Sequence, residues 1–549
     1  MKWWQKTILY ECYPKSFLDT RAQGTGTLRG IIEKLPYLES LGVGALWLTP
    51  IYKSPMVDNG YDVEDYYQID PVYGSMTDMD ELITEGKKHG IRIVMDLVFN
   101  HTSDQCAWFK ESKTSRDNPK SNWYVWADPK EDGSAPTNWR SIFGGSAWKW
   151  CEERKQYYLH TFAEAQPDLN WESPELRKAL YDVANFWVDK GVGGFRIDAI
   201  SYIKKPSVFT DGEPDGQDGL AALNGLVNNM DGILDFLNEF KKEVCEGKDI
   251  FTVGETNGIS HDMLKDWVGD EGVFDMLIEY THISPEFKQN ENWCEPQEWK
   301  LSDLKKMLSA SQNVINNLGW YPIYFENHDK PRCIDHYFEE NANKVLTAKL
   351  IGTMLMTLRG TPFIYQGQEI GMSNVSWPDI SCYNDISSLE QYKTAINSGY
   401  SKEDALKGIH RFSRDNARTP MQWSSNRNAG FTDGEPWLSV NENYLTVNVD
   451  KEENDPSSVL NYYRKLNQLR KEYPCLISGS YKSLNDEDDQ IYAYERHYED
   501  QIIRIILNFT GQEFVYEDIP EGSKILLCSY PEHHKDILQP YEALIIKID

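Results

Sequence analysis

The chain has 549 residues, too many for one ordinary domain, and its 40% hydrophobic and 26% charged residues are typical of a globular protein. The formal net charge of −30 argues against nucleic acid or an anionic membrane as a partner, because both are negatively charged. Nine cysteines are scattered singly without a Cys-x-x-Cys pair, which favours a reducing compartment. The start, MKWWQKTILYECYP, has no apolar segment of signal-peptide length, and no stretch approaches the ~18 apolar residues of a membrane span. We therefore expect a cytoplasmic protein.

Short β-rich runs alternate with helical patterns along the chain. The first run is followed by a helical pattern at 28–42, and the second by one at 79–90. Eight strands separated by helical stretches are what a (β/α)8 barrel requires, so we predict an α/β fold of this type. Chemistry in such barrels lies at the carboxyl ends of the strands. The eight predicted strands lie within residues 6–17, 43–52, 91–101, 191–200, 249–256, 273–281, 320–329 and 361–369.

Two stretches interrupt this alternation, and a third segment follows it. Residues 103–171 are rich in Trp, Gly, Pro and Asn and lack a long helical pattern, so we predict a small inserted domain after strand three. A second insertion is expected at about 373–438, after strand eight. Short alternating runs such as IIRIILNF predict an antiparallel β-sandwich domain at 481–549. The barrel would then comprise 1–102 and 172–480.

The stretch GVGGFRIDAIS, residues 191–201, places Arg196 and Asp198 inside a run typical of a buried strand. Alternate side chains on a strand share a face, so the two point the same way. Burying an ion costs several kcal/mol unless it is well paired. Either the two form a structural pair, or their face opens onto a site that needs charge.

Four predicted strands carry a carboxylate at or near their ends: Asp96, Asp198, Glu255 and Asp329. A single acid there is usually a cap or one half of an ion pair. Four in chain order on one barrel, two of them close to a histidine (His101 and His328), indicate a catalytic site.

The segments MDLVFNH, FRIDAI, VGETNG and FENHDKPR resemble the ordered signature regions of the α-amylase family of retaining glycoside hydrolases, family 13. The resemblance covers essentially the whole chain, and the block QPDLNW is similar to that of the oligo-1,6-glucosidase and α-glucosidase branch. It implies that Asp198 is the nucleophile, Glu255 the general acid/base and Asp329 the transition-state stabiliser. Asp96 would orient Arg196, which favours the charged form of the nucleophile.

The resemblance also implies a pocket closed at one end. In relatives an aspartate and an arginine block the non-reducing end of the site; Asp58 with Arg414 is our choice here, since Arg418 could equally be a structural ion-pair partner. Such a floor predicts an exo-acting enzyme on short oligosaccharides. Further predicted sugar contacts are Tyr61, His101, Phe143, Phe162, Gln166, Arg196, Ala199, Asn257 and His328, with Lys330 on the acceptor side.

Many relatives have an acidic calcium loop after strand one, which here reads DTRAQGTGT. Asp19 keeps its carboxylate, but Arg21, Gln23 and Thr27 stand where oxygen-rich ligands are expected. Ca²⁺ takes six to eight oxygen ligands and an arginine repels it, so we predict that the calcium site is lost and that no cofactor is needed.

The resemblance predicts a retaining exo-α-glucosidase that takes a small oligosaccharide. Valine after the nucleophile accompanies α-1,6 enzymes in this branch, and alanine or threonine accompanies α-1,4 enzymes, so Ala199 favours maltose-type substrates. The alternatives are an oligo-1,6-glucosidase and a sucrose- or trehalose-type transglucosidase. The same barrel occurs in non-catalytic heavy chains of amino-acid transporters, but this chain keeps all three carboxylates and has no spanning segment.

Overall fold

The computed structural model describes residues 1–216, 218–269, 271–286 and 292–548. The chain divides into two compact units, which are described separately below. Unit 1 comprises Met1–Leu46, Lys88–Ile91 and Tyr280–Asp549, and unit 2 comprises Trp47–Lys87 and Arg92–Glu279.

All eight predicted barrel strands are present in one eight-stranded sheet, in the order β13-β12-β10-β5-β2-β1-β15-β14. Barrel strands that follow one another in the chain are neighbours in this order, except β13 and β14, which stand at its two ends. The last strand of the chain to join the sheet, β15, pairs in parallel with the first, β1. This arrangement confirms the predicted (β/α)8 barrel. The strands are β1 (Leu9–Cys12), β2 (Ala45–Leu48), β5 (Arg92–Val98), β10 (Gly194–Asp198), β12 (Phe251–Glu255), β13 (Met276–Ile278), β14 (Pro322–Ile323) and β15 (Thr361–Tyr365).

In unit 2, β10 lies between β5 and β12 and is buried along its whole length. Arg196 stands opposite Asp96 in the parallel register, so the pairing of β10 with β5 brings these two side chains together. The preceding helix α6 (Pro174–Lys190) is capped at its start by Ser173, whose side chain accepts from the Leu176 N–H, and at its end by Gly191, which has a φ of 98°. These are ordinary start and stop signals, and they fix where β10 begins.

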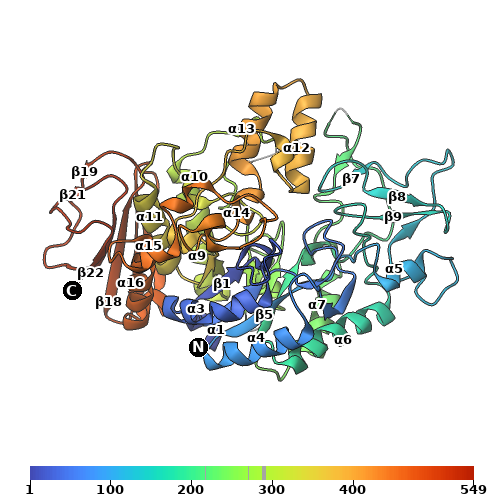
Figure 1. The fold of residues 1–549 in the computed structure, drawn as a ribbon, viewed down its shortest axis with the longest axis horizontal. Helices are drawn as coiled ribbons and strands as arrows, with labels where there is room; N and C mark the ends of the chain where they lie inside the picture. The colour runs from blue at the N-terminus through green and yellow to red at the C-terminus, as the bar shows by residue number, and fades with distance from the viewer. Residues whose placement is uncertain (217, 270, 287–291, 549) are drawn as a thin grey trace. The chain divides into compact units, whose positions relative to one another are not determined.

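The segment predicted as an inserted domain contains a three-stranded sheet of β6 (Trp126–Ala127), β9 (Gln156–Leu159) and β8 (Trp148–Cys151), whose labels β8 and β9 stand in the teal part of Figure 1. Trp139, Trp148 and Leu159 are buried in its core, so large apolar side chains hold together a segment that has little regular structure.

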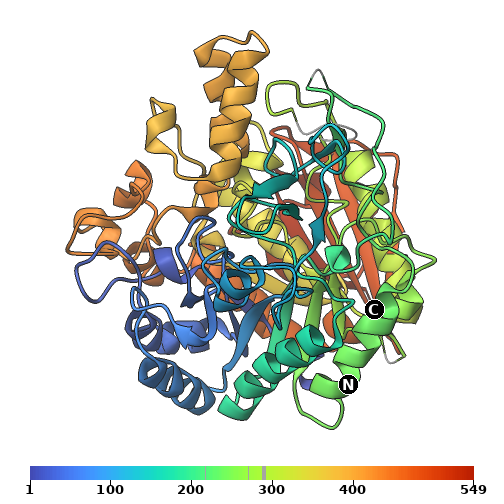
Figure 2. The ribbon, with the colours of Figure 1, turned by 90° about the vertical axis from the view of Figure 1, so that its right-hand side faces the viewer.

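In unit 1, a five-stranded antiparallel sheet closes the chain, with β16 (Ser480–Leu484), β17 (Ile491–Tyr498), β18 (Gln501–Asn508), β22 (Ala543–Ile548) and β20 (Lys524–Cys528) in that order. Figure 2 shows these strands in red and orange lying side by side. The predicted C-terminal antiparallel β domain is thus confirmed. The region after β15 carries the paired helices α12 (Ile386–Asn397) and α13 (Lys402–Phe412), followed by the short α14 (Asp415–Arg418).

All nine cysteines lie within the described residues and are free. No helix in the described part of the chain has both the length and the apolar character needed to cross a membrane. The cytoplasmic location stays a prediction.

Candidate active site

A single buried guanidinium joins three carboxylates in unit 2. The Arg196 Nη1 lies 2.9 Å from Asp96 Oδ1 and 2.7 Å from Asp198 Oδ1, and its Nη2 lies 2.7 Å from Glu255 Oε1. The Arg196 side chain is only 2% exposed. Because β5, β10 and β12 are adjacent strands, the three acids converge on the cation that the middle strand supplies. The structure thus brings together two of the predicted catalytic carboxylates.

The charge of Arg196 is fixed by these neighbours. Burial lowers the pKa of a guanidinium, but attraction to Asp96, Glu255 and Asp198 outweighs that effect and holds the pKa of Arg196 well above its usual range. Asp96 itself is 1% exposed and also accepts from Trp47 Nε1 at 3.3 Å. Its surroundings are therefore those of a positioning carboxylate, enclosed by donors.

Glu255 receives two donors at its two oxygens. Arg196 Nη2 faces Oε1, and the backbone N–H of Ala199 donates to Oε2 over 2.8 Å. Ala199 has a φ of 45°, a left-handed conformation that residues other than glycine seldom adopt, and it directly follows Asp198. Such backbone strain is often found at functional sites, and here it aims the N–H at the second carboxylate.

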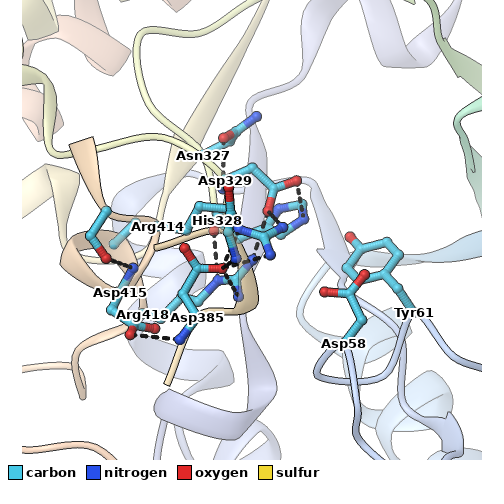
Figure 3. A network of polar contacts seen from close by, with 12 residues as sticks. Asp58, Tyr61, Asn327, His328, Asp329, Asp385, Arg414, Asp415 and Arg418 are labelled. Atoms are coloured by element: carbon cyan, nitrogen blue, oxygen red, sulfur yellow. Dashed lines mark hydrogen bonds and ion pairs between the residues drawn. The ribbon is translucent and has the colours of Figure 1, made fainter. Parts of the chain in front are cut away.

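The segment between β3 (Tyr52–Lys53) and β4 (Asp65–Ile69) positions Asp58 and Tyr61. The carboxylate of Asp62 accepts from the backbone N–H groups of Val57 (2.9 Å) and Asp58 (3.0 Å), which fixes the turn. The Tyr61 hydroxyl donates to Asp96 Oδ2 over 3.0 Å and so joins the Arg196 cluster. Both predicted contact residues are labelled in Figure 3.

Gln166 and His101 lie beside Asp58. The Gln166 amide accepts from the Ala163 N–H through Oε1, so its Nε2 is left to donate to Asp58 Oδ2 over 3.1 Å. His101 Nε2 lies 3.1 Å from the Tyr61 carbonyl oxygen and 3.1 Å from Gln166 Nε2. Burial lowers the pKa of His101 to about 4, so the ring is neutral near pH 7 and offers a hydrogen bond rather than a charge.

The two predicted aromatic contact residues, Phe143 and Phe162, pack against each other, and Phe162 also packs against His101. The Phe162 ring lies 5.2 Å from the His101 ring and 5.8 Å from the Phe143 ring, measured between centroids. Asn257, in contrast, is exposed, and its backbone makes the described contacts: its N–H donates to Ser201 Oγ and its carbonyl accepts from Asn229. Its predicted contact with sugar stays a prediction.

In unit 1, Asp329 lies in a second charged cluster, drawn in Figure 3. Its Oδ1 is 2.7 Å from Arg418 Nη2 and 3.1 Å from Arg414 Nη1, and its Oδ2 is 3.2 Å from His328 Nε2. Burial raises the pKa of Asp329, but the charges of His328, Arg414 and Arg418 outweigh it and hold that pKa well below the usual range. Asp329 is therefore an anion at any physiological pH.

Asp385, which sequence reasoning missed, completes this cluster. It is buried at the start of α12, where its oxygens accept from the Ser387 and Ser388 N–H groups. The same carboxylate lies 2.7 Å from Arg414 Nε and 4.0 Å from Arg418 Nη1. The sequence around it (NDISS) has the pattern of a helix cap, which gives no sign of a second role. Both arginines thus contact Asp329, including the one that was not our choice.

Two other predicted positions have protein partners in unit 1. Lys330 Nζ donates to Ser284 Oγ over 3.1 Å. Asp19 accepts from the Arg21 N–H (2.7 Å), the Gly24 N–H (2.7 Å) and the Thr432 hydroxyl (2.6 Å). A carboxylate surrounded by donors in this way does not fit the oxygen-rich shell that a calcium ion needs.

A parallel barrel whose strand ends carry clustered carboxylates defines the general class of barrel enzymes. The alpha amylase catalytic-domain family matches residues 11–479. The oligo-1,6-glucosidase of Halalkalibacterium halodurans is 41% identical over 556 residues, covering 99% of this chain and 98% of the relative. The trehalose-6-phosphate hydrolase of Bacillus subtilis is 40% identical, covering 100% and 98%. The solved isomaltulose synthase of Klebsiella sp. LX3 gives a TM-score of 0.95 at 36% identity, covering 100% and 99%.

The chain therefore belongs to the alpha-amylase family, which confirms the resemblance drawn from its sequence, and it is a glycoside hydrolase.

The Arg196 cluster yields a first prediction. Arg196→Lys removes the planar fork that reaches three carboxylates, and a lysine ammonium on a shorter stem cannot replace it. Asp198 and Glu255 would lose the donor that they share, so we expect kcat/KM on a short α-glucoside to fall by about 100-fold or more, equivalent to about 2.7 kcal/mol. Arg177→Lys, whose arginine pairs with Glu239 in the same unit, is the matched control and should keep its activity. A folded R196K enzyme with activity within about tenfold of wild type would contradict this reading.

The Asp385 contacts yield a second prediction. Asp385→Asn keeps the cap but removes the charge that holds Arg414, so we expect kcat/KM to fall by about 10–100-fold, equivalent to ~1.4–2.8 kcal/mol. Asp379→Asn is the control: it is an exposed aspartate in the same region that also caps a helix, accepting from the Ser381 N–H over 2.9 Å. Equal effects of the two substitutions would show that capping alone matters.

Proposed function

We propose that this protein is a retaining exo-α-glucosidase that removes glucose from the non-reducing end of short α-glucosides. The observation that carries the proposal is the single Arg196 guanidinium within 2.7 Å of both Asp198 and Glu255. A retaining glycosidase needs two carboxyl groups about 5–5.5 Å apart, one as the nucleophile and one as the acid/base. Because one planar cation contacts both carboxyl groups, Asp198 and Glu255 lie on the same guanidinium, which supports the close spacing that retention needs.

The steps follow from these contacts. Asp198 Oδ forms a bond to the anomeric carbon while the bond to the glycosidic oxygen breaks, and Glu255 gives its proton to that leaving oxygen. The donors from Arg196 and the Ala199 N–H stabilise the carboxylate that Glu255 then becomes. Water next gives a proton to Glu255 and bonds to the same carbon as the Asp198 ester breaks. Two inversions return the α-anomer.

We propose that Asp329 acts on the same glucosyl unit as Asp198 and Glu255. All three follow the carboxyl ends of strands of one parallel sheet, and such ends share one face of a barrel. Its permanent negative charge suits the stabilisation of an oxocarbenium-like transition state. The resemblance assigns the terminal glucose hydroxyls to Asp58, which Gln166 holds in unit 2, and to Arg414.

We infer that α-1,4 linkages are favoured, from Ala199, which follows Asp198 and leaves more room beside the leaving group than a valine would. The nearest rival is an α-1,6 preference, because oligo-1,6-glucosidases are among the relatives. A pocket difference of methylene size is worth about 1–3 kcal/mol, so both linkages can be cleaved with unequal efficiency.

A substrate panel tests this proposal. Maltose, maltotriose, isomaltose, sucrose, trehalose and trehalose 6-phosphate are compared by kcat/KM, and the anomer released is followed by ¹H NMR. We expect release of α-glucose and a maltose-over-isomaltose ratio of about 10 or more. Asp198→Asn should lose about 10⁴-fold or more in kcat because the nucleophile is gone. Release of β-glucose would contradict retention, and a preference for isomaltose or trehalose 6-phosphate would overturn the linkage inference.

We also propose that the chain works without calcium, on the ground that Asp19 is surrounded by donors. Dialysis against EDTA should leave both kcat/KM and the thermal midpoint unchanged, and adding Ca²⁺ should not raise either. Ca²⁺ at 100 times the Kd of a real site would raise the free energy of unfolding by about 2.7 kcal/mol. A calcium-dependent rise of several degrees in the thermal midpoint would therefore contradict the proposal.

A further inference from the structure

Glu11 is a buried acid that the proposed chemistry does not use. It lies in β1, all of whose residues are buried, and it is 2% exposed. The strand otherwise reads as apolar, and a carboxylate there is costly unless something compensates it. Its partner therefore indicates why it is present.

That partner is His328, which lies 317 positions further along the chain. Glu11 Oε1 lies 2.6 Å from His328 Nδ1 and accepts from the His328 backbone N–H over 3.2 Å. On the other side of the ring, Nε2 lies 3.2 Å from Asp329 Oδ2. The imidazole is fully buried between two carboxylates, and one of them is the candidate transition-state stabiliser.

We propose that Glu11 is a positioning residue that keeps both nitrogens of His328 protonated and so holds an N–H donor against Asp329. The proposal rests on the proposed function only where activity is measured, because the protonation of the ring can be observed directly.

A neutral imidazole carries one ring proton, on either Nδ1 or Nε2. The Glu11 carboxylate can only accept, so a neutral His328 would place its proton on Nδ1. Nε2 would then present a lone pair to the anionic Asp329, which is repulsive. Only the doubly protonated ring gives both carboxylates a donor.

The other groups around the ring do not reverse this conclusion. The Tyr13 ring stacks on the imidazole at 6.4 Å with an interplanar angle of 15°. Arg418 donates from Nε to the His328 carbonyl oxygen over 2.9 Å, and its Nη2, like Arg414, is turned to Asp329. Burial lowers the pKa of His328, but Asp329 and Glu11 outweigh it and raise the pKa to about 9.

Glu11→Gln is a sharp test because it changes charge but little else. A glutamine Oε1 can still accept from Nδ1–H and from the backbone N–H, while the negative charge that favours the imidazolium is lost. The folded-state pKa of His328 should therefore fall, and the Nε2 proton should be lost as the pH rises through the lowered value. Below that value the variant should resemble the wild type.

The direct readout is the histidine ¹H–¹³C NMR titration, with the His328 signal assigned by its absence in His328→Asn. We expect wild-type His328 to remain an imidazolium beyond pH 8, and its midpoint in E11Q to fall by about one pH unit or more, a tenfold change in the proton-binding constant. In activity, kcat/KM of E11Q relative to wild type should be lower at pH 8 than at pH 6, by about twofold if the midpoint falls by one pH unit and by about tenfold if it falls by two.

Glu369→Gln is the matched control. Glu369 is also fully buried in unit 1, and it accepts from the Tyr10 and Tyr37 hydroxyls, over 2.9 and 2.7 Å, without contacting His328. This variant should leave the midpoint of the His328 titration unchanged from that of the wild type. Wild-type His328 titrating below pH 7 would overturn the proposal even if E11Q failed to fold, and so would an unmoved midpoint in folded E11Q. If the substrate panel failed while the titration behaved as expected, the proposed function would be wrong and the role of Glu11 would stand.

Discussion

The central constraint in this protein is the placing of one arginine on the middle of three adjacent parallel strands. Arg196 and Asp198 lie on β10. Asp96 stands opposite Arg196 on β5 and Glu255 ends β12, so the sheet register brings three carboxyl groups to one buried cation. Neither the buried arginine nor the buried carboxylates would be stable without the other, because removing one member of a buried ion pair lowers the free energy of unfolding by about 3–5 kcal/mol. The ion pairs that compensate for this burial are also the contacts that would hold Asp198, the proposed nucleophile, beside Glu255, the proposed acid/base.

In the second cluster the charges are reversed, because a single carboxylate is compensated by several cations. Here one carboxylate, Asp329, is surrounded by cations, two arginines from α14 and its flank and the imidazole of His328. Asp385 and Glu11 stand behind these cations and set their orientation and charge. Each candidate catalytic acid thus depends on residues that contact its own partners. These residues fix the orientation and the protonation of those partners and do not themselves bind the sugar.

The sequence predicted the barrel because eight short apolar runs alternate with helical patterns. It indicated the candidate catalytic acids because those runs end in carboxylates and resemble the signature regions of the α-amylase family. Arg196 was also predictable, since period-two alternation places it beside Asp198. Glu11 was not: one acid in an apolar strand has no local signal, and its partner is 317 positions away. The sequence around Asp385 predicts a helix cap, and Asp385 does cap α12, but this pattern does not indicate that it also contacts the two arginines. Local sequence patterns predict strands, helices and their caps, whereas contacts between residues far apart in the chain can be found only from the three-dimensional structure.

The most direct test of the account is to trap the intermediate on the enzyme. An α-glucosyl fluoride with a second fluorine at C5 destabilises positive charge at the anomeric carbon, while its good leaving group lets the first step proceed, so the covalent glucosyl-enzyme accumulates. Peptide mass spectrometry then locates the label. The account predicts one label per chain, on the carboxylate of Asp198. A label on any other side chain would contradict it.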